Sequence, residues 1–240
     1  MTSLRPLGVV TWNIHGCIGP DGHRDPSRVA RVLRALNADV VALQEVEKNG
    51  QDGAGHQSGF LAAALGMTLV EGPTRLLTDG HYGNALLTRL PIREERRLDL
   101  TVPGREPRGA LDVDLVWGGR LARVITTHLG LNAWERHEQV SRLLEALDRN
   151  GRAAVTLVLG DFNTWFPGSR AARRLDERMG RGVAPPAWPA WRPLFHPDRI
   201  WADPRPALTE AHAHAGDLAR RSSDHLPLRA DVLPGMIHAL

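Results

Sequence analysis

Short apolar runs of strand length recur along the whole chain. Their β-branched and leucine-rich composition is typical of strands that are buried on one or both faces. These runs cover residues 7–12, 38–43, 85–88, 111–116, 121–127, 153–159, 199–202 and 228–232. The runs at 111–116 and 121–127 flank Gly118 and Gly119, and a Gly-Gly pair between two strands is typical of a tight hairpin turn. At least part of the sheet is therefore expected to be antiparallel.

Two segments between these runs repeat apolar residues at helical spacing instead. In the first, Asp25 and Pro26 form an expected N-cap followed by proline at the first helical position. The apolar face that follows consists of Val29, Val32, Leu33 and Leu36. A second helix is predicted within residues 134–147. Many strands with a few interspersed helices predict α/β layers built around sheet.

Length and composition fit one large globular domain. The chain has 240 residues, of which 42% are hydrophobic and 24% charged, so it can bury a substantial core and is not expected to be disordered. Residues 180–206 are rich in proline and tryptophan. That stretch is too aromatic for a linker. It is interpreted as an ordered surface excursion, and residues 1–240 are predicted to form a single domain.

The chain carries no sequence signal for disulfides, secretion or membrane insertion. Its one cysteine, Cys17, excludes an internal disulfide and a structural zinc site made of cysteines. The first residues lack the charged and apolar pattern of a signal peptide, and no run approaches the ~20 apolar residues of a membrane-spanning helix. A cytoplasmic, monomeric protein without a transmembrane segment is expected.

Arginine supplies nearly all of the positive charge. The formal net charge is +3, and Lys48 is the one lysine in the chain. A planar guanidinium suits phosphate, but so strong a bias toward arginine is better explained by genomic composition. The charge is compatible with an anionic substrate and does not identify it.

Polar side chains gather where the apolar runs stop. They are Asn13 and His15, Gln44 and Glu45, His128, Asp161 and Asn163, and the Ser223-Asp224-His225 segment. Each group alone has an ordinary structural explanation, such as a turn former or a buried histidine with satisfied hydrogen bonds. Five such groups at strand ends together indicate a functional site.

The residue types suit hydrolysis of a phosphoester. Glu45 and the amide oxygen of Asn13 are hard oxygen ligands of the kind that Mg²⁺ or Mn²⁺ prefers. Asp161 and Asn163 lie two residues apart, so in an extended chain both reach to the same side. Asp161 could then position or deprotonate a water, and Asn163 could donate to a phosphate oxygen, while histidines stabilise charge or move protons.

Seven segments in order along the chain resemble the motif series of the endonuclease/exonuclease/phosphatase superfamily. They read TWNIHG, LQEVE, GNALLTRLPI, TTHLG, GDFNTW, HPDRIW and SSDHLPL. This superfamily includes deoxyribonuclease I, apurinic endonucleases, sphingomyelinases and inositol polyphosphate phosphatases. The resemblance runs from about residue 9 to residue 232. It implies a four-layered α/β sandwich in which two mixed, mainly antiparallel sheets pack face to face with helices outside.

The resemblance also implies roles for single residues. Glu45 matches the principal metal ligand, with Asn13 beside it and Asp224 near the metal. Asp161 matches the catalytic aspartate, and Asn163 matches the phosphate-binding asparagine.

Three histidines complete the implied site. His225 matches the histidine that contacts the scissile phosphate, and its expected carboxylate partner is Asp198. His128 stands where nucleases of the deoxyribonuclease I type carry a second histidine, which favours protonation of the leaving oxygen, and Asn84 is expected to orient it. His15 stands where apurinic endonucleases carry an aspartate, so one divalent ion is expected. His15 itself is either a ligand for Mn²⁺ or Zn²⁺ or an uncharged hydrogen-bonding group.

The implied reaction is in-line attack by water on phosphorus, with Mg²⁺ or Mn²⁺ as cofactor. A phosphodiester, in particular a nucleic acid, is favoured as the substrate, and Asn84, Arg108 and Trp165 are the expected substrate-binding residues. Two alternatives stay open. One is a phospholipid phosphodiesterase or phosphomonoesterase of the same superfamily, and the other is a phosphate-binding module that has lost catalysis.

Overall fold

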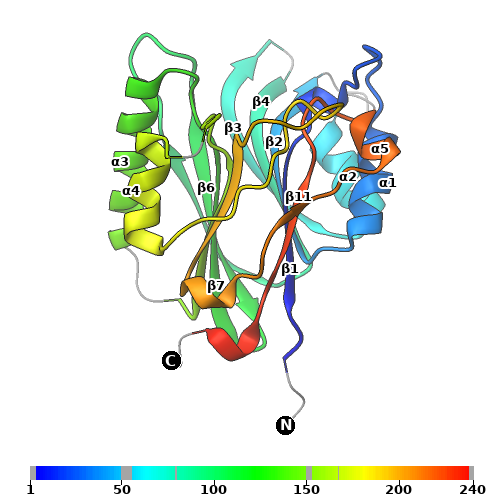
Figure 1. Ribbon diagram of the computed structural model, residues 1–240. Coiled ribbons are helices and arrows are strands. Elements are labelled where there is room, and N and C mark those ends of the chain that lie inside the picture. The colour runs from blue at the N-terminus through cyan, green and yellow to red at the C-terminus, as the bar shows by residue number, and fades with distance from the viewer. Residues whose placement is uncertain (1–3, 50–55, 79, 150–152, 167, 238–240) are drawn as a thin grey trace.

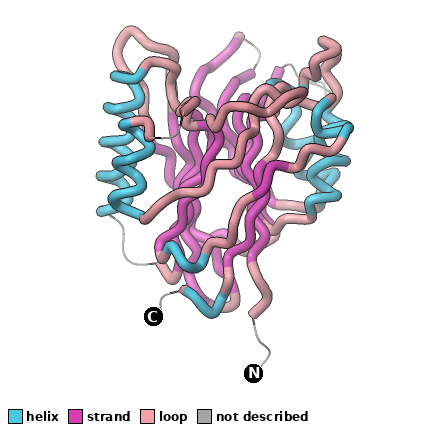
Figure 2. The backbone as a smooth tube through the Cα atoms, in the orientation of Figure 1, coloured by secondary structure: helices cyan, strands magenta, loops and turns pink. Residues whose placement is uncertain are grey.

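Two β-sheets pack face to face in the computed structural model, and helices cover their outer faces (Figure 1). The structure describes residues 4–49, 56–78, 80–149, 153–166 and 168–237. Figure 2 shows the strands gathered in the middle of the molecule and the long helices at its two sides. This arrangement of layers confirms the α/β sandwich expected from the sequence.

The first sheet has six strands in the order β10-β11-β1-β2-β4-β3. Their bounds are β1 (Leu7–Asn13), β2 (Val40–Asn49), β3 (Thr68–Leu77), β4 (Gly80–Thr88), β10 (His212–Ala213) and β11 (Leu228–Val232). Strands β1 and β2 are parallel and are joined through helix α1 (Pro26–Leu36), while the other neighbours are antiparallel. The chain therefore leaves β1 and β2 at the same end of the sheet.

The second sheet has five strands in the order β5-β6-β7-β8-β9. Their bounds are β5 (Ile92–Asp99), β6 (Gly109–Trp117), β7 (Arg120–His128), β8 (Val155–Asp161) and β9 (Asp198–Asp203). Only β7 and β8 are parallel among these described strands, and helix α3 (Ala133–Arg149) joins them. The predicted hairpin is confirmed: Gly118 and Gly119 connect β6 to β7 with φ of +56° and +79°, a conformation that favours glycine.

Two pairs of helices cover the sandwich (Figure 1). Helices α1 and α2 (Gln57–Leu65) lie on the first sheet, and α3 and α4 (Arg170–Met179) lie on the second. Shorter elements are η1 (His15–Cys17), η3 (Arg205–Ala207), α5 (Asp217–Arg220) and η4 (Pro234–Met236). Asp25 caps α1 as predicted, because its carboxylate accepts from the backbone N–H groups of Ser27 and Arg28. No helix in the described part of the chain is long and apolar enough to cross a membrane.

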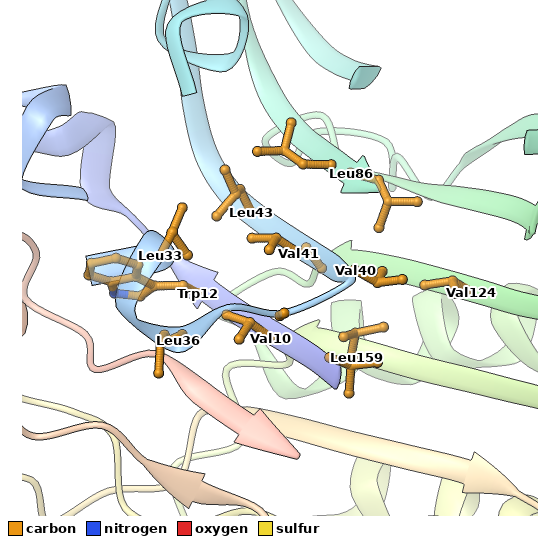
Figure 3. Packing of buried hydrophobic residues seen from close by; sticks show 14 of the residues in the cluster. Val10, Trp12, Leu33, Leu36, Val40, Val41, Leu43, Leu86, Val124 and Leu159 are labelled. Atoms are coloured by element: carbon orange, nitrogen blue, oxygen red, sulfur yellow. The ribbon is translucent and has the colours of Figure 1, made fainter. Parts of the chain in front are cut away.

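Strand alternation gives each sheet one face toward the other sheet and one toward the helices. In β1, Val10 and Trp12 lie near Leu33 and Leu36 of α1 (Figure 3), so Val9, Thr11 and Asn13 share the opposite face. On that inner side Val40 of β2 lies near Val124 of β7 in Figure 3. All of these apolar side chains are buried.

The space between the sheets becomes polar toward one end. Gln44 of β2 donates through Nε2 to Thr11 Oγ1 at 3.2 Å and to Thr126 Oγ1 at 3.3 Å, which connects the two sheets through buried side chains. The residues that follow Thr11 and Thr126 by two, Asn13 and His128, point into the same space. The polar groups noted in the sequence are therefore the continuation of the core at its open end.

The segment between α4 and β9 is held by backbone hydrogen bonds, which supports its interpretation as an ordered excursion. Ala187 N–H donates to Phe195 O, and Leu226 N–H donates to Ala187 O, both at 2.9 Å. Val183 pairs with Ile200 of β9. This segment approaches the same end of the sandwich as the polar groups, because Ala190 N–H donates to Asp224 O at 2.7 Å.

Candidate active site

The register of the second sheet puts three predicted site residues in one row. Asp161 at the end of β8 is paired with His128 of β7 on one side and with Asp198 of β9 on the other. Residues paired in register project to the same face of a sheet. His128, Asp161 and Asp198 therefore all point into the space between the sheets, and all three are buried.

Asn13 connects this row to the first sheet. Its Nδ2 donates to Asp161 Oδ2 at 3.0 Å and to Glu45 Oε1 at 2.8 Å, while its Oδ1 accepts from the backbone N–H of His15 at 3.0 Å. The sequence suggested the amide oxygen of Asn13 as a metal ligand. In the structure the amide nitrogen faces the carboxylates instead, because the turn at His15 takes the oxygen.

Glu45 lies within a strand, which corrects the expectation that it follows the end of one. Strand β2 continues to Asn49, and its pairing with β4 shifts between Leu43 and Val46, as in a β-bulge. Glu45 has φ of +56°, an uncommon conformation for a residue with a side chain. Burial alone would raise the pKa of Glu45, but hydrogen bonds from His15 and Asn13 and the nearby His128 lower it to about 2.

His15 lies between two predicted metal ligands. Its Nδ1 is 3.4 Å from Glu45 Oε2 and 3.8 Å from Asp224 Oδ1. The hydrogen bond with Glu45 raises the pKa of His15. Asp224 is fixed from its other side by Trp188, whose indole Nε1–H donates to Oδ2 at 3.1 Å. Among the described residues, neither Glu45 nor Asp224 forms an ion pair with lysine or arginine.

His225 lies close to two aspartates, Asp161 and Asp198. Its Nδ1 is 2.8 Å from Asp198 Oδ2, and its Nε2 is 3.8 Å from Asp161 Oδ2. Ligand atoms of these three residues lie within 4.8 Å of one another. Burial alone would lower the pKa of His225, but Asp198, Asp161 and Asp224 raise it to about 10. The imidazole is therefore a cation at neutral pH. Ser223 holds it in place, since Oγ accepts from His225 N–H at 3.1 Å and donates to Asn13 O at 2.7 Å.

Asp161 and Asn163 form a turn and also belong to the candidate active site, so both explanations of this motif apply. Asn163 N–H donates to Asp161 Oδ1 at 2.9 Å, and Asn163 has φ of +50°. Its Nδ2 donates to Leu129 O at 2.8 Å. Burial alone would raise the pKa of Asp161, but the neighbouring histidines and the hydrogen bonds from Asn13 and Asn163 lower it. The turn thus presents an ionised carboxylate.

His128 is neutral, and hydrogen-bond donors face both of its ring nitrogens. Arg108 Nη1 lies 3.2 Å from Nδ1, and Asn163 Nδ2 lies 3.1 Å from Nε2. Burial lowers the pKa of His128, and Arg108 lowers it further. Nε2 also lies 3.5 Å from Asp161 Oδ2. The expected role of His128 in protonating the leaving oxygen stays a prediction.

Asn84 and Trp165 have surroundings that differ from the expected ones. Asn84 Nδ2 donates to Gly109 O at 3.0 Å, so Arg108 and not Asn84 orients His128. Trp165 belongs to an aromatic cluster, with its ring 4.7 Å from that of Trp188 in an edge-on contact. Asn84 nevertheless lies close to Arg108 and His128.

One residue of the site, Tyr82, and one contact, that of Trp188 with Asp224, were not found from the sequence. Burial raises the pKa of the Tyr82 phenol, and the Glu45 carboxylate beside it raises it further. Tyr82 precedes Asn84 by two in β4, so strand alternation could have placed it on the same face. Trp188 carries no comparable local signal, because its contact with Asp224 spans two distant segments.

The comparison with known protein families identifies the family of this chain. The model of the Endonuclease/Exonuclease/phosphatase family matches residues 10–225, a span that contains every residue of the site described above. The chain belongs to this family. Members of the endonuclease/exonuclease/phosphatase family hydrolyse phosphoester bonds, so the chain is a phosphoester hydrolase. The resemblance seen in the seven sequence segments is confirmed.

Relatives and solved structures of the endonuclease/exonuclease/phosphatase family agree with this assignment. The uncharacterized protein YbhP of Escherichia coli is 32% identical over 223 residues, which cover 83% of this chain and 85% of that protein. An endonuclease/exonuclease/phosphatase from Beutenbergia cavernae is 26% identical with a TM-score of 0.75, over 95% of this chain and 72% of that one. A mannosyl-6-phosphatase from Bacteroides thetaiotaomicron has the same fold, with 16% identity and a TM-score of 0.78 over 95% of this chain and 99% of that one.

Proposed function

We propose that the protein is a divalent-metal-dependent phosphodiesterase that hydrolyses its substrate by in-line attack of water, in the manner of a nuclease. One observation carries this proposal. Asn13 of the first sheet donates to Asp161 of the second, and Asp161 lies between a neutral His128 and the His225–Asp198 pair. An anionic acceptor next to one neutral and one cationic donor suits water attack on an anionic phosphorus centre.

The residues near His15 fit a small divalent cation. Glu45 and Asp224 offer carboxylate oxygens that converge on one imidazole without a lysine or arginine partner among the described residues. Such hard oxygen donors suit Mg²⁺ or Mn²⁺. Asn13 could add its oxygen only by turning its amide, since the nitrogen now faces Glu45. A bound ion would neutralise phosphate oxygens and so make the phosphorus easier to attack.

The chain's own side chains supply the remaining steps. Asp161 aligns the attacking water and accepts its proton, because the carboxylate is ionised and buried. His225 donates from Nε2 to the phosphoryl group while Asp198 holds Nδ1. Asn163 stabilises the same group from the turn that it forms with Asp161. His128, which Arg108 contacts at Nδ1, lies beside Asp161 as a neutral hydrogen-bonding group.

The preferred substrate is a phosphodiester of the nucleic-acid type. Large aromatic side chains are exposed in the segment between Asp161 and Asp198. Phe166 is 65% exposed and Trp191 is 69% exposed. Exposed aromatic rings suit bases, which stack on them. Solved structures with the same fold and under 25% identity include human Nocturnin, zebrafish TDP2 and the mannosyl-6-phosphatase, so the fold by itself does not choose among substrates.

Asp161→Asn tests the proposal, with a substrate panel of bis-p-nitrophenyl phosphate, its monoester, DNA, RNA and phospholipid vesicles. The wild type is expected to hydrolyse diesters with Mg²⁺ or Mn²⁺ and to lose this activity in EDTA. Asp161→Asn should abolish turnover, while Asp231→Asn, which alters an ion pair with Arg229 in β11, should not. Faster hydrolysis of the monoester or of phospholipid would identify one of the alternative activities. Absence of any hydrolysis would favour a phosphate-binding module.

A further inference from the structure

A cavity opens directly beside the predicted metal ligands. Its volume is about 260 Å³, and its lining includes His15 and Asp224 of the candidate active site. The rest of the lining comes from two segments, one with Ile18 and Pro20 and one with Trp188 and Trp191. A group attached to a phosphate held at His15 and Asp224 would therefore extend into this cavity.

The segment with Trp188 and Trp191 is held rigidly. Trp188 donates to Asp224 Oδ2, and its ring lies 4.7 Å from Trp165 and 5.7 Å from Phe195. The backbone of the Trp188 turn is pinned by Leu194 N–H and Phe195 N–H, which donate to Trp188 O at 3.0 Å and 2.9 Å. A rigid aromatic wall lowers the entropy that is lost when a ligand is ordered against it.

Trp191 is unusual because its turn is fixed and its ring is exposed. Ala190, the residue before it, donates its N–H to Asp224 O and accepts from Arg220 Nη1. The Trp191 side chain is nevertheless 69% exposed. Single exposed apolar residues are common on protein surfaces and need no explanation. A large exposed indole on a fixed turn beside the candidate active site instead indicates a binding surface.

The segment with Ile18 and Pro20 is equally constrained. Gly19 lies so close to the neighbouring segment that a Cβ atom there would be 2.1 Å from Arg221 O. Ile18 pairs with Arg24, and Gly19 N–H donates to His23 O at 3.2 Å. Both segments that line the cavity, which is called the slot below, are therefore held by backbone contacts.

Charge and size restrict the occupant of this slot. Among the described residues that line it, none is lysine or arginine, and the titratable ones are His15 and Asp224. The remaining lining therefore suits a neutral group and not a second phosphate. The volume of about 260 Å³ is enough for a planar ring with part of a sugar.

We propose that this slot is a nucleobase subsite. The base of the nucleoside that is esterified to the scissile phosphate stacks there on the exposed face of Trp191. The inference rests on the proposed phosphodiesterase function and names its substrate as a nucleotidyl ester. Stacking on tryptophan accepts any base, because every base presents a flat aromatic face. The enzyme is thus expected to need a base beside the cleaved bond and to tolerate its identity.

The test compares three small phosphodiesters in Mg²⁺ or Mn²⁺. They are thymidylyl-thymidine, the same compound with both bases removed, and glycerophosphocholine. Trp191→Ala should lower kcat/KM for thymidylyl-thymidine by about 5- to 150-fold, the range that corresponds to the loss of one stacked base. Trp191→Phe should retain most of the activity. Hydrolysis of the base-free diester should be equal in wild type and Trp191→Ala. Trp134→Ala is the matched control, since Trp134 is 57% exposed and does not line the slot.

A binding measurement makes the inference testable without turnover. Thymidine 5′-monophosphate is expected to quench tryptophan emission of the wild type, and this quenching should be smaller in Trp191→Phe, where Trp188 still lines the slot, and unchanged in Trp134→Phe. If the wild type cleaves no diester but shows this quenching, the proposed function fails and the base subsite stands.

Three results would overturn the base subsite while leaving phosphodiester hydrolysis intact. The first is an equal effect of Trp191→Ala on the dinucleotide and its base-free form. The second is no effect of Trp191→Ala on either compound. The third is a preference for glycerophosphocholine that depends on Trp191, which would assign the slot to a quaternary ammonium headgroup through cation–π contact.

Discussion

Asp198→Asn tests how much the carboxylate that contacts His225 Nδ1 contributes to catalysis. The substitution keeps the size of a side chain that is fully buried, but it removes the negative charge 2.8 Å from His225 Nδ1. A charge-assisted hydrogen bond is worth about 1.5–3 kcal/mol. If this energy stabilises the transition state, kcat should fall about 10- to 150-fold, because ~1.36 kcal/mol corresponds to a factor of ten. KM should change little, since Asp198 itself is screened from the substrate by His225.

The assay is initial-rate kinetics with bis-p-nitrophenyl phosphate, with thermal unfolding to verify that the variant folds. Asp198 raises the pKa of His225, so the pKa of His225 in the metal-free variant should lie below the value of about 10. ¹⁵N NMR titration measures it directly. His225 then loses its proton at lower pH, and activity should decline at a lower alkaline pH than in the wild type. An unchanged kcat together with a lowered His225 pKa would refute the reasoning, because it would show that the cationic imidazole does not act in the transition state.

Three further changes probe the metal site and the fold. His15→Asn should weaken Mn²⁺ binding in calorimetry by at least about tenfold and Mg²⁺ binding less, since an imidazole nitrogen 3.4 Å from Glu45 Oε2 favours Mn²⁺, and equal effects on both ions would contradict this. Arg123→Met should destabilise the fold by about 2 kcal/mol in urea unfolding, because it removes a 2.7 Å ion pair with the fully buried Asp112, which keeps Arg96 as a partner, and a hydrogen bond to Ala146 O, and a change below about 0.5 kcal/mol would count against it. Gly160→Ala should cost more than about 3 kcal/mol, because φ is +151° and a Cβ would lie 2.0 Å from a carbonyl oxygen of β7, and a Tm equal to that of the wild type would disprove this.

Local patterns were enough to find the strands that carry the site. The runs at 121–127 and 153–159 correspond to β7 and β8, and the polar residues that follow them lie on the inner face. Periodicity predicts such positions because each depends only on the alternation of neighbouring side chains. The N-cap at Asp25 is equally local, since the carboxylate contacts N–H groups two and three residues ahead.

Four described elements of eight or more residues were not predicted. Strand β5 is an edge strand with the sequence IREERRLD, and its charges hide the alternation. Helix α2, with the sequence QSGFLAAAL, is apolar on most sides and offers no distinct stripe. Strand β3 contains Gly72 and Pro73, which interrupt its pattern. Helix α4 did carry a readable signal, because Ser169 caps it and its buried residues repeat at helical spacing.

The sequence by itself determined which residues are capable of phosphoester chemistry and that each stands near the end of an apolar run. Only the tertiary structure decided how they meet. Asn13 and Asp161 are 148 residues apart and touch because two separate sheets pack together. The bulge at Glu45, the contacts of His128 and the slot beside Trp191 likewise depend on partners from distant segments. Sequence patterns record the periodicity of neighbours, whereas side-chain orientation and protonation depend on contacts that exist only after the sheets have packed.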